Sequence, residues 1–276
     1  MSVKNKVVVI TGAGGVLCSV FAKALAREGA KVALIGLHEA NVKRVCEEIV
    51  ADGGMAMYYE CNVLDKSALE IVHADVNERF GKCDILINGA GGNNPRATTA
   101  NEYYMEGDEA REDIKTFFNL DKEDFDFVFS LNLMGTVLPT QVFAKDMTRD
   151  GGVILNVSSM NAIKPLTKIP AYSSAKSAVT NLTEWLAVHF AGAGIRVNAI
   201  APGFFVTKQN KDLLFDSDGN PTARSNKILN ATPMRRFGKP EELVGTLLWL
   251  CDDDASGFVT GITVAVDGGF SAYSGV

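Results

Sequence analysis

Short apolar runs alternate with amphipathic stretches along most of the chain. Runs of four to six residues that are apolar throughout are typical of strands buried on both faces of a parallel sheet. The stretches between them have helical spacing, as in residues 19–28 and 178–190. The pattern predicts an α/β fold with a single Rossmann-like, doubly wound parallel sheet and helices on both faces. The predicted strands are residues 7–10, 31–35, 55–60, 85–88, 153–157, 196–201 and 263–266.

One segment interrupts this alternation. Residues 93–124 are polar and rich in aromatic side chains, and they are too many for an ordinary loop between a strand and a helix. No linker, repeat or low-complexity stretch marks a second domain, so we expect residues 1–276 to form one catalytic domain. The long segment follows the carboxyl end of a predicted strand, where open α/β sheets bind ligands. It is expected to form a wall or lid of the substrate pocket.

Composition narrows the possible partners. The net charge is −6 and there is no basic cluster, which argues against a nucleic-acid partner. There is no signal-peptide pattern and no evident apolar stretch of membrane-spanning length, so we expect a cytoplasmic protein without a membrane partner. Five cysteines are scattered and form no Cys-x-x-Cys pair, which predicts reduced thiols and no metal site.

Glycine-rich turns follow the first and fourth predicted strands. Such turns let the backbone approach a pyrophosphate at the positive end of a helix. An amide after the third strand, Asn62 beside Val63, is a candidate contact for an adenine ring. We therefore predict a dinucleotide site whose glycine-turn residues are Thr11, Gly12, Gly14, Gly15, Val16, Leu17, Asn88, Gly89 and Ala90.

The end of the second predicted strand leaves the choice of dinucleotide open. NAD-specific sites commonly carry an acid there to accept a hydrogen bond from the ribose 2′-hydroxyl, and this chain has Gly36 instead. No arginine follows to bind a 2′-phosphate. The expected cofactor is therefore NAD or NADP.

A tyrosine and a lysine four residues apart form the candidate catalytic group. Tyr172 and Lys176 share one face of a predicted helix, so the ammonium is expected to lower the pKa of the phenol towards neutral pH. A phenol tuned in this way can act as a general acid and base. Ser159, the second of two serines in the preceding loop, is placed to hold a substrate oxygen against it.

In this order the motifs resemble the short-chain dehydrogenase/reductase family over essentially the whole chain. The resemblance rests on Thr11-Gly12, residues 88–91, Asn132, the Ser159–Tyr172–Lys176 set and residues 202–207. It implies that Tyr172 is the general acid and base, that Ser159 polarises the carbonyl and that Lys176 binds the nicotinamide ribose. It also implies that Asn132 holds a proton-relay water, and it adds Pro202, Gly203 and Thr207 to the cofactor site. The chain departs from the family pattern at Val16, Cys18 and Asn62.

Finer features resemble the branch of this family described as D-mannonate oxidoreductases. They are residues 91–95, 117–121, 204–207 and 269–276. This resemblance implies interconversion of D-fructuronate and D-mannonate. Alternatives are gluconate-type or 3-oxoacyl substrates, or a non-catalytic regulator that senses the cofactor. Relatives usually pair their late helix and C-terminal tail across two-fold axes, which implies a homotetramer.

A sugar acid requires a cation for its carboxylate and polar groups for its hydroxyls. Arg96 is the first expected carboxylate ligand, with Lys164 or Lys168 as the alternatives. The full set of candidates is Arg96, Lys164, Lys168, Lys208 and Arg224, with Asn93, Asn94 and Asn161 as neutral partners.

Overall fold

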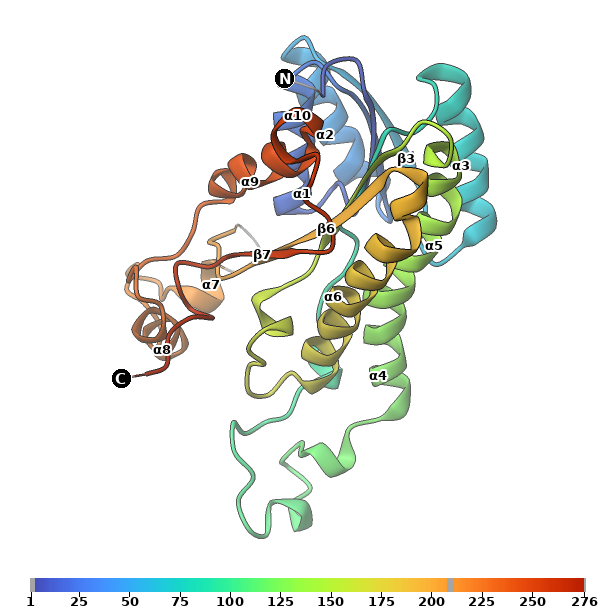
Figure 1. The fold of residues 1–276 in the computed structure, drawn as a ribbon. Coiled ribbons are helices and arrows are strands. Elements are labelled where there is room, and N and C mark those ends of the chain that lie inside the picture. Colours follow the sequence, from blue (N-terminus) through green and yellow to red (C-terminus); the bar gives the residue numbers. More distant parts are fainter. Residues whose placement is uncertain (1–2, 208–210, 276) are drawn as a thin grey trace.

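Seven parallel strands form the centre of the protein, as the computed structural model of residues 3–207 and 211–275 shows (Figure 1). Their order is β3-β2-β1-β4-β5-β6-β7, which is the doubly wound arrangement predicted from the sequence. Each predicted strand is present within one residue at either end. The strands are β1 (Val7–Thr11), β2 (Lys31–Gly36), β3 (Met55–Glu60), β4 (Ile85–Asn88), β5 (Gly152–Val157), β6 (Ile195–Pro202) and β7 (Thr263–Val266).

Helices cover both faces of the sheet because alternate strand residues point to opposite sides. The helices are α1 (Val16–Arg27), α2 (Glu39–Ala51), α3 (Lys66–Arg79), α4 (Lys122–Phe129), α5 (Gly135–Phe143), α6 (Pro170–Phe190), α7 (Lys211–Leu214), α8 (Ala223–Ala231), α9 (Val244–Cys251) and α10 (Asp253–Ser256). Val8 and Ile10 of β1 join a core with α1, α2 and α9, whereas Val7 and Val9 join a second core with α3, α5 and α6.

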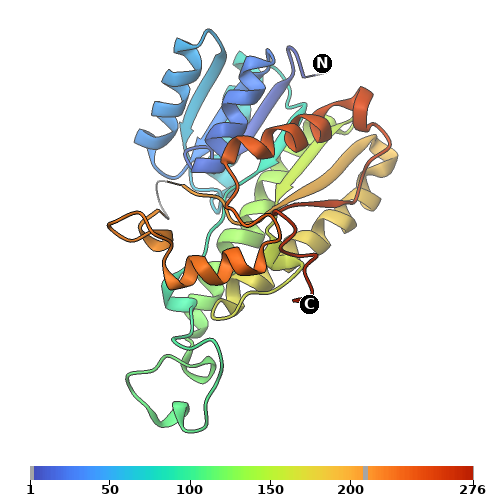
Figure 2. The same ribbon diagram turned by 90° about the vertical axis from the view of Figure 1, so that its left-hand side faces the viewer.

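The long segment between β4 and α4 projects from the body of the protein (Figures 1 and 2). It contains three single-turn helices, Pro95–Ala97, Asp108–Ala110 and Phe117–Asn119. Hydrogen bonds from Thr99 N–H to the Lys168 carbonyl (2.8 Å) and from Lys227 to Glu102 (2.8 Å) connect its base to the rest of the chain. The predicted excursion is therefore present, and its base lies beside α8 and the loop before α6.

One expectation needs correction. The continuous helical run Lys122–Met147 has a mean hydropathy of 1.4 over its most apolar window and is long enough to cross a bilayer. Half of that window is buried inside the fold, and the run packs against α3 and α6. Core helices meet the same criteria of length and composition. The packing assigns this run to the core of the fold.

Candidate active site

A cavity of about 480 Å³ opens at the carboxyl ends of the central strands. It lies where the strand order reverses on either side of β1, which is the ligand-binding position of doubly wound sheets. The N-terminus of α1 faces it, and no side chain caps that end of the helix. Its lining includes the predicted cofactor residues Gly12, Gly14, Gly15, Val16, Leu17, Gly89, Ala90, Tyr172, Lys176, Pro202, Gly203 and Thr207.

Close backbone approach explains the glycines at two positions of this cavity. Gly12 has φ +65°, and a Cβ there would lie 2.7 Å from the Gly89 carbonyl oxygen. A Cβ on Gly91 would lie 2.6 Å from Asn132 Oδ1 and 3.1 Å from Lys176 Nζ. Side chains are thus excluded where the two turns meet. The cradle fits a dinucleotide pyrophosphate at the N-terminus of α1.

Tyr172, Ser159 and Lys176 converge at one end of the cavity. Tyr172 and Lys176 are one turn apart on α6, and Lys176 Nζ lies 5.8 Å from the centroid of the Tyr172 ring. The Ser159 hydroxyl lies close enough to the Tyr172 phenol to lower its pKa. The Ser158 hydroxyl instead contacts Thr180 Oγ1 at 2.8 Å. The structure thus brings together the three predicted groups and distinguishes the two serines.

Burial changes the expected titration of this group. Burial lowers the pKa of Lys176 to about 8, because the ammonium is removed from water. The ammonium still donates a hydrogen bond to the Val157 carbonyl at 2.8 Å. The pKa of Tyr172 is raised by burial, and the Ser159 hydroxyl lowers it in part. The expectation that the Lys176 ammonium brings the pKa of the phenol down towards neutral pH is therefore wrong, because removal from water is the larger effect.

Asn132 is fully buried in a π-helical turn, Ser130–Met134, between α4 and α5. Its side chain bonds both backbone groups of Gly92, accepting from N–H at 3.1 Å and donating to the carbonyl at 2.8 Å. Thr136, which the sequence did not single out, donates to the Asn132 carbonyl at 2.9 Å. Asn132 thus fixes the turn beside Lys176, and the proton-relay water remains a prediction.

Two predicted cofactor residues, Thr11 and Asn88, lie outside the cavity lining and hold the strands and turns that form it. Thr11 Oγ1 accepts hydrogen bonds from the N–H groups of Gly89 and Ala90 at 3.1 and 3.2 Å. The Asn88 amide points into the core, where it donates to Thr140 Oγ1 at 3.0 Å and Asn156 Oδ1 at 2.9 Å. The Asn88 side chain therefore ties β4 to β5 and α5, and a contact between this residue and the cofactor remains a prediction.

At the adenosine end of the cavity, the two residues expected to contact the adenine ring lie outside the lining. Asn62 Oδ1 accepts from Leu64 N–H at 3.0 Å, Val63 is buried, and neither residue belongs to the cavity lining. The end of β2 and the first turn of α2 line that region instead, because they face the glycine turn across the sheet edge. The residues that sequence reasoning missed or set aside there are Leu37, His38, Asn41 and Val42.

The first candidate for a carboxylate ligand already has a partner. Arg96 Nε lies 3.1 Å from Asp124 Oδ1, and Asp124 is buried beside Lys115 as well. Lys164 donates to the Tyr273 carbonyl. In this structure the Arg96 charge therefore holds the excursion on α4, and its role as the ligand of a substrate carboxylate remains a prediction.

The other candidates have different surroundings. Lys168 has φ +73°, a strained backbone conformation for a residue with a side chain, and its carbonyl is held by Thr99. Asn161 is buried and its Oδ1 has no hydrogen-bond partner among the described residues. Asn93 donates to Thr98 Oγ1 at 3.3 Å, and Asn94 accepts from Arg96 N–H at 2.9 Å. Lys208 lies outside the described residues.

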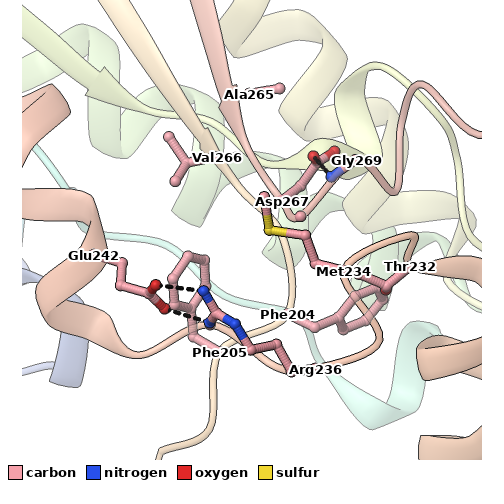
Figure 3. A pocket seen from close by; sticks show the side chains of 12 residues that line it. Phe204, Phe205, Thr232, Met234, Arg236, Glu242, Ala265, Val266, Asp267 and Gly269 are labelled. Atoms are coloured by element: carbon pink, nitrogen blue, oxygen red, sulfur yellow. Dashed lines mark hydrogen bonds and ion pairs between the residues drawn. The ribbon is translucent and has the colours of Figure 1, made fainter.

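A second cavity, of about 390 Å³, lies at the ends of β6 and β7 (Figure 3). Its walls include the apolar side chains of Phe204, Phe205 and Met234. Arg236 is the one cation among the described lining residues, and it donates two hydrogen bonds to Glu242 at 2.6 and 2.7 Å. That pairing lowers the pKa of Glu242 to about 2. The cavity therefore offers an apolar wall and an ion pair that is already satisfied.

The described residues contain no cluster of metal-binding side chains, and their thiols are buried. Within residues 3–207 and 211–275 no three His, Cys, Asp or Glu side chains are grouped to hold a metal ion. All five cysteines are buried and unpaired. Burial raises the pKa of Cys18, which lines the cofactor cavity, to about 12.

The fold and the groups along its carboxyl edge define a class of nicotinamide-dependent oxidoreductase. The chain belongs to the short-chain dehydrogenase/reductase family, since residues 15–271 match the family described as enoyl-(acyl carrier protein) reductase. It is accordingly an oxidoreductase that acts on a CH–OH group or its carbonyl with NAD or NADP.

Three relatives refine this comparison. A solved structure from Haemophilus influenzae, with NAD bound, is provisionally described as a D-mannonate oxidoreductase. Its sequence is 56% identical to this chain, and the two structures superpose with a TM-score of 0.95 over 99% of this chain and 97% of that one. The uncharacterized oxidoreductase UxuB of Bacillus subtilis is 54% identical over 99% of this chain and 97% of its own length. The 2-dehydro-3-deoxy-D-gluconate 5-dehydrogenase of Dickeya dadantii is 32% identical, over 98% of this chain and 97% of its own.

Proposed function

We propose that the protein interconverts D-fructuronate and D-mannonate. The balanced reaction is D-fructuronate + NAD(P)H + H⁺ ⇌ D-mannonate + NAD(P)⁺. The observation that carries the proposal is the 56% identity, along almost the whole of both chains, with the NAD-bound protein provisionally described as a D-mannonate oxidoreductase. The chain also keeps the Ser159, Tyr172 and Lys176 side chains together at the cavity, as turnover requires.

The side chains act on the proton and on the substrate oxygen. The dinucleotide supplies or accepts the hydride when it is bound. Ser159 holds the substrate oxygen, and Tyr172 donates a proton to it during reduction and takes that proton back during oxidation. Lys176 lies under the Tyr172 ring and stabilises the phenolate that forms when the proton leaves. Asn132 holds the turn at Gly91 and Gly92 against this group.

NAD is the favoured dinucleotide. Gly36, Leu37, His38 and Asn41 line the adenosine end of the cavity, and none of these described residues is a lysine or arginine that could neutralise a 2′-phosphate. The NAD bound by the Haemophilus relative supports the same choice.

A panel of carbonyl substrates tests the proposal. Purified protein is assayed with NADH and with NADPH on D-fructuronate, 5-keto-D-gluconate, a 3-oxoacyl thioester and a neutral ketose. We expect the highest kcat/KM with D-fructuronate. A higher kcat/KM with the thioester or with 5-keto-D-gluconate would identify that compound as the substrate in place of D-fructuronate. Absence of turnover on every carbonyl compound would favour a regulator that senses the cofactor.

We also propose that the protein works in the cytoplasm as a homotetramer. The tetramer is supported by large apolar side chains that are exposed in the single chain and that contact with another copy would bury. They are Trp185 and Val188 on the outer side of α6, and the fully exposed Phe258 before β7. Light scattering should give four times the mass of one chain, and Phe258→Glu should shift the distribution to smaller species. A monomer mass for the unmodified protein at micromolar concentration contradicts the tetramer.

A further inference from the structure

Four charged side chains from three separate segments meet where the excursion reaches the body. Glu102 comes from the excursion, Arg224 and Lys227 come from α8, and Lys168 comes from the loop before α6. Lys227 Nζ lies 2.8 Å from Glu102 Oε1. Lys227, Lys168 and Arg224 all lower the pKa of the Glu102 carboxyl, with the hydrogen bond from Lys227 as the largest cause. One of the three cations therefore contacts the Glu102 carboxylate directly, and the other two act on it through space.

This cluster differs from the other cations near the site. Arg96 is paired with Asp124, Arg236 with Glu242, and Lys164 with a backbone carbonyl. Lys168 and Arg224 have no carboxylate oxygen within 4.0 Å in the described parts of the chain. Their charges are therefore available to an anion that reaches them.

The chain connects the cluster to the reacting end of the cavity. Lys168 precedes Tyr172 by four residues, so their Cα atoms are at most about 14 Å apart even in a fully extended chain. Its backbone is held in a strained conformation by Thr99, at the base of the excursion. Figure 2 shows α8 passing across the front of the protein next to the start of the excursion. The cluster therefore lies at the boundary between excursion, α8 and the catalytic loop.

We propose that Lys168 and Arg224 bind the carboxylate of the sugar-acid substrate, and that Glu102 is a resident carboxylate that weakens this binding by partly neutralising the cluster. The proposal rests on the sugar-acid function proposed above. A guanidinium can bind a carboxylate through two parallel hydrogen bonds, and an ammonium adds a third donor. Glu102 remains on Lys227 and limits the charge that an incoming acid encounters.

Three substitutions, two that remove a cation and one that removes the carboxylate charge, test the proposal. Lys168→Met and Arg224→Met should each raise KM for D-fructuronate about tenfold, because each removes one charge-assisted contact. Glu102→Gln should lower that KM about threefold, because the cluster becomes more positive. A general disturbance of folding cannot produce this lowering. Arg149→Met, which removes an exposed charge elsewhere, is the matched control and should leave KM unchanged.

A neutral ketose of similar size distinguishes charge recognition from structural damage. Its KM should be the same in wild type, Lys168→Met, Arg224→Met and Glu102→Gln. Equal losses on the acid and the neutral ketose, or an unchanged KM for D-fructuronate in both cation variants, overturn the proposal. If the wild type prefers another keto acid, D-fructuronate is not the substrate. The KM values of the same variants for that other acid then test whether the cluster binds a carboxylate. If it prefers the neutral ketose, both proposals fail.

Discussion

The cofactor side of this protein and the side that we propose to bind the substrate, called the substrate side, are built by different means. The cofactor cavity is framed by the ends of β1, β2, β4 and β6, whose backbones are fixed by the sheet, and it contains the buried side chain of Lys176. The substrate side is framed by the excursion, by α8 and by the loop before α6, whose charged side chains are largely exposed. Fixed strand ends suit chemistry that needs accurate placement, whereas loops suit recognition that varies between relatives.

The strength of electrostatic interactions also differs between the two sides. On the cofactor side, exclusion of water shifts the pKa values of Tyr172 and Lys176, so electrostatic effects there are strong. On the substrate side, the Glu102–Lys227 pair faces solvent and is screened by salt. Substitutions in the first region should therefore change the rate of the chemical step, and those in the second should change KM for acidic substrates.

Removal of the Tyr172 hydroxyl should give the largest effect. Tyr172→Phe keeps the ring but loses the proton, so kcat should fall by about 10²- to 10⁴-fold while the dissociation constant for the dinucleotide stays close to that of the wild type. Steady-state assays and a fluorescence titration with NADH measure the two quantities. A variant that keeps more than about a tenth of wild-type kcat shows that the chemistry does not depend on this phenol.

The sequence predicts the cofactor side better than the substrate side for physical reasons. Strand ends follow from local apolar runs, and the spacing of Tyr172 and Lys176 follows from helix geometry. The Arg96–Asp124 pair could not be predicted, because it depends on how the excursion folds back onto α4. The direction of the Tyr172 pKa also depends on burial created by distant segments.

Asn88 is an instructive intermediate case. It lies two residues after Leu86 in β4, so strand alternation places both side chains on the face covered by α5 and α6. This alternation is visible in the sequence, whereas the glycines that follow Asn88 indicate only that the backbone turns there. Alternation along a strand is thus a better guide to a side chain's direction than proximity to a motif.

Lys176 should make the stability of the cofactor-free protein depend on pH. Its pKa is about 8 in the folded state and 10.5 ordinarily. Between these values the unfolded chain binds a proton that the folded protein does not, so the free energy of unfolding rises with pH across this window. The total rise is about 3 kcal/mol relative to Lys176→Met, which lacks the titration.

Urea denaturation of wild type and Lys176→Met at about pH 7 and about pH 10 measures this difference. The exposed residue Lys145, changed to methionine, serves as the control and should follow the wild type at both pH values. Equal pH dependence of wild type and Lys176→Met would mean that the ammonium is not desolvated in the folded protein, and the contrast between the two regions would lose its electrostatic basis.

Leu37 should give a smaller effect and sharpen the account of the adenosine end. Gly36→Asp is a poor test, because a Cβ at Gly36 would lie 2.7 Å from Val42 Cγ1 in the core. Leu37 is exposed and lines the same part of the cavity. Leu37→Asp should raise the ratio of kcat/KM for NAD to that for NADP about tenfold, because the acid repels a 2′-phosphate, and Leu37→Arg should lower it about tenfold.

Leu37→Asn controls for loss of the apolar side chain, since it adds no charge. Its ratio of kcat/KM for NAD to that for NADP should lie between those of the charged variants. If aspartate and arginine shift the ratio in the same direction, the adenosine ribose does not lie beside Leu37. The lining described at the end of β2 would then not be the surface that binds the adenosine ribose.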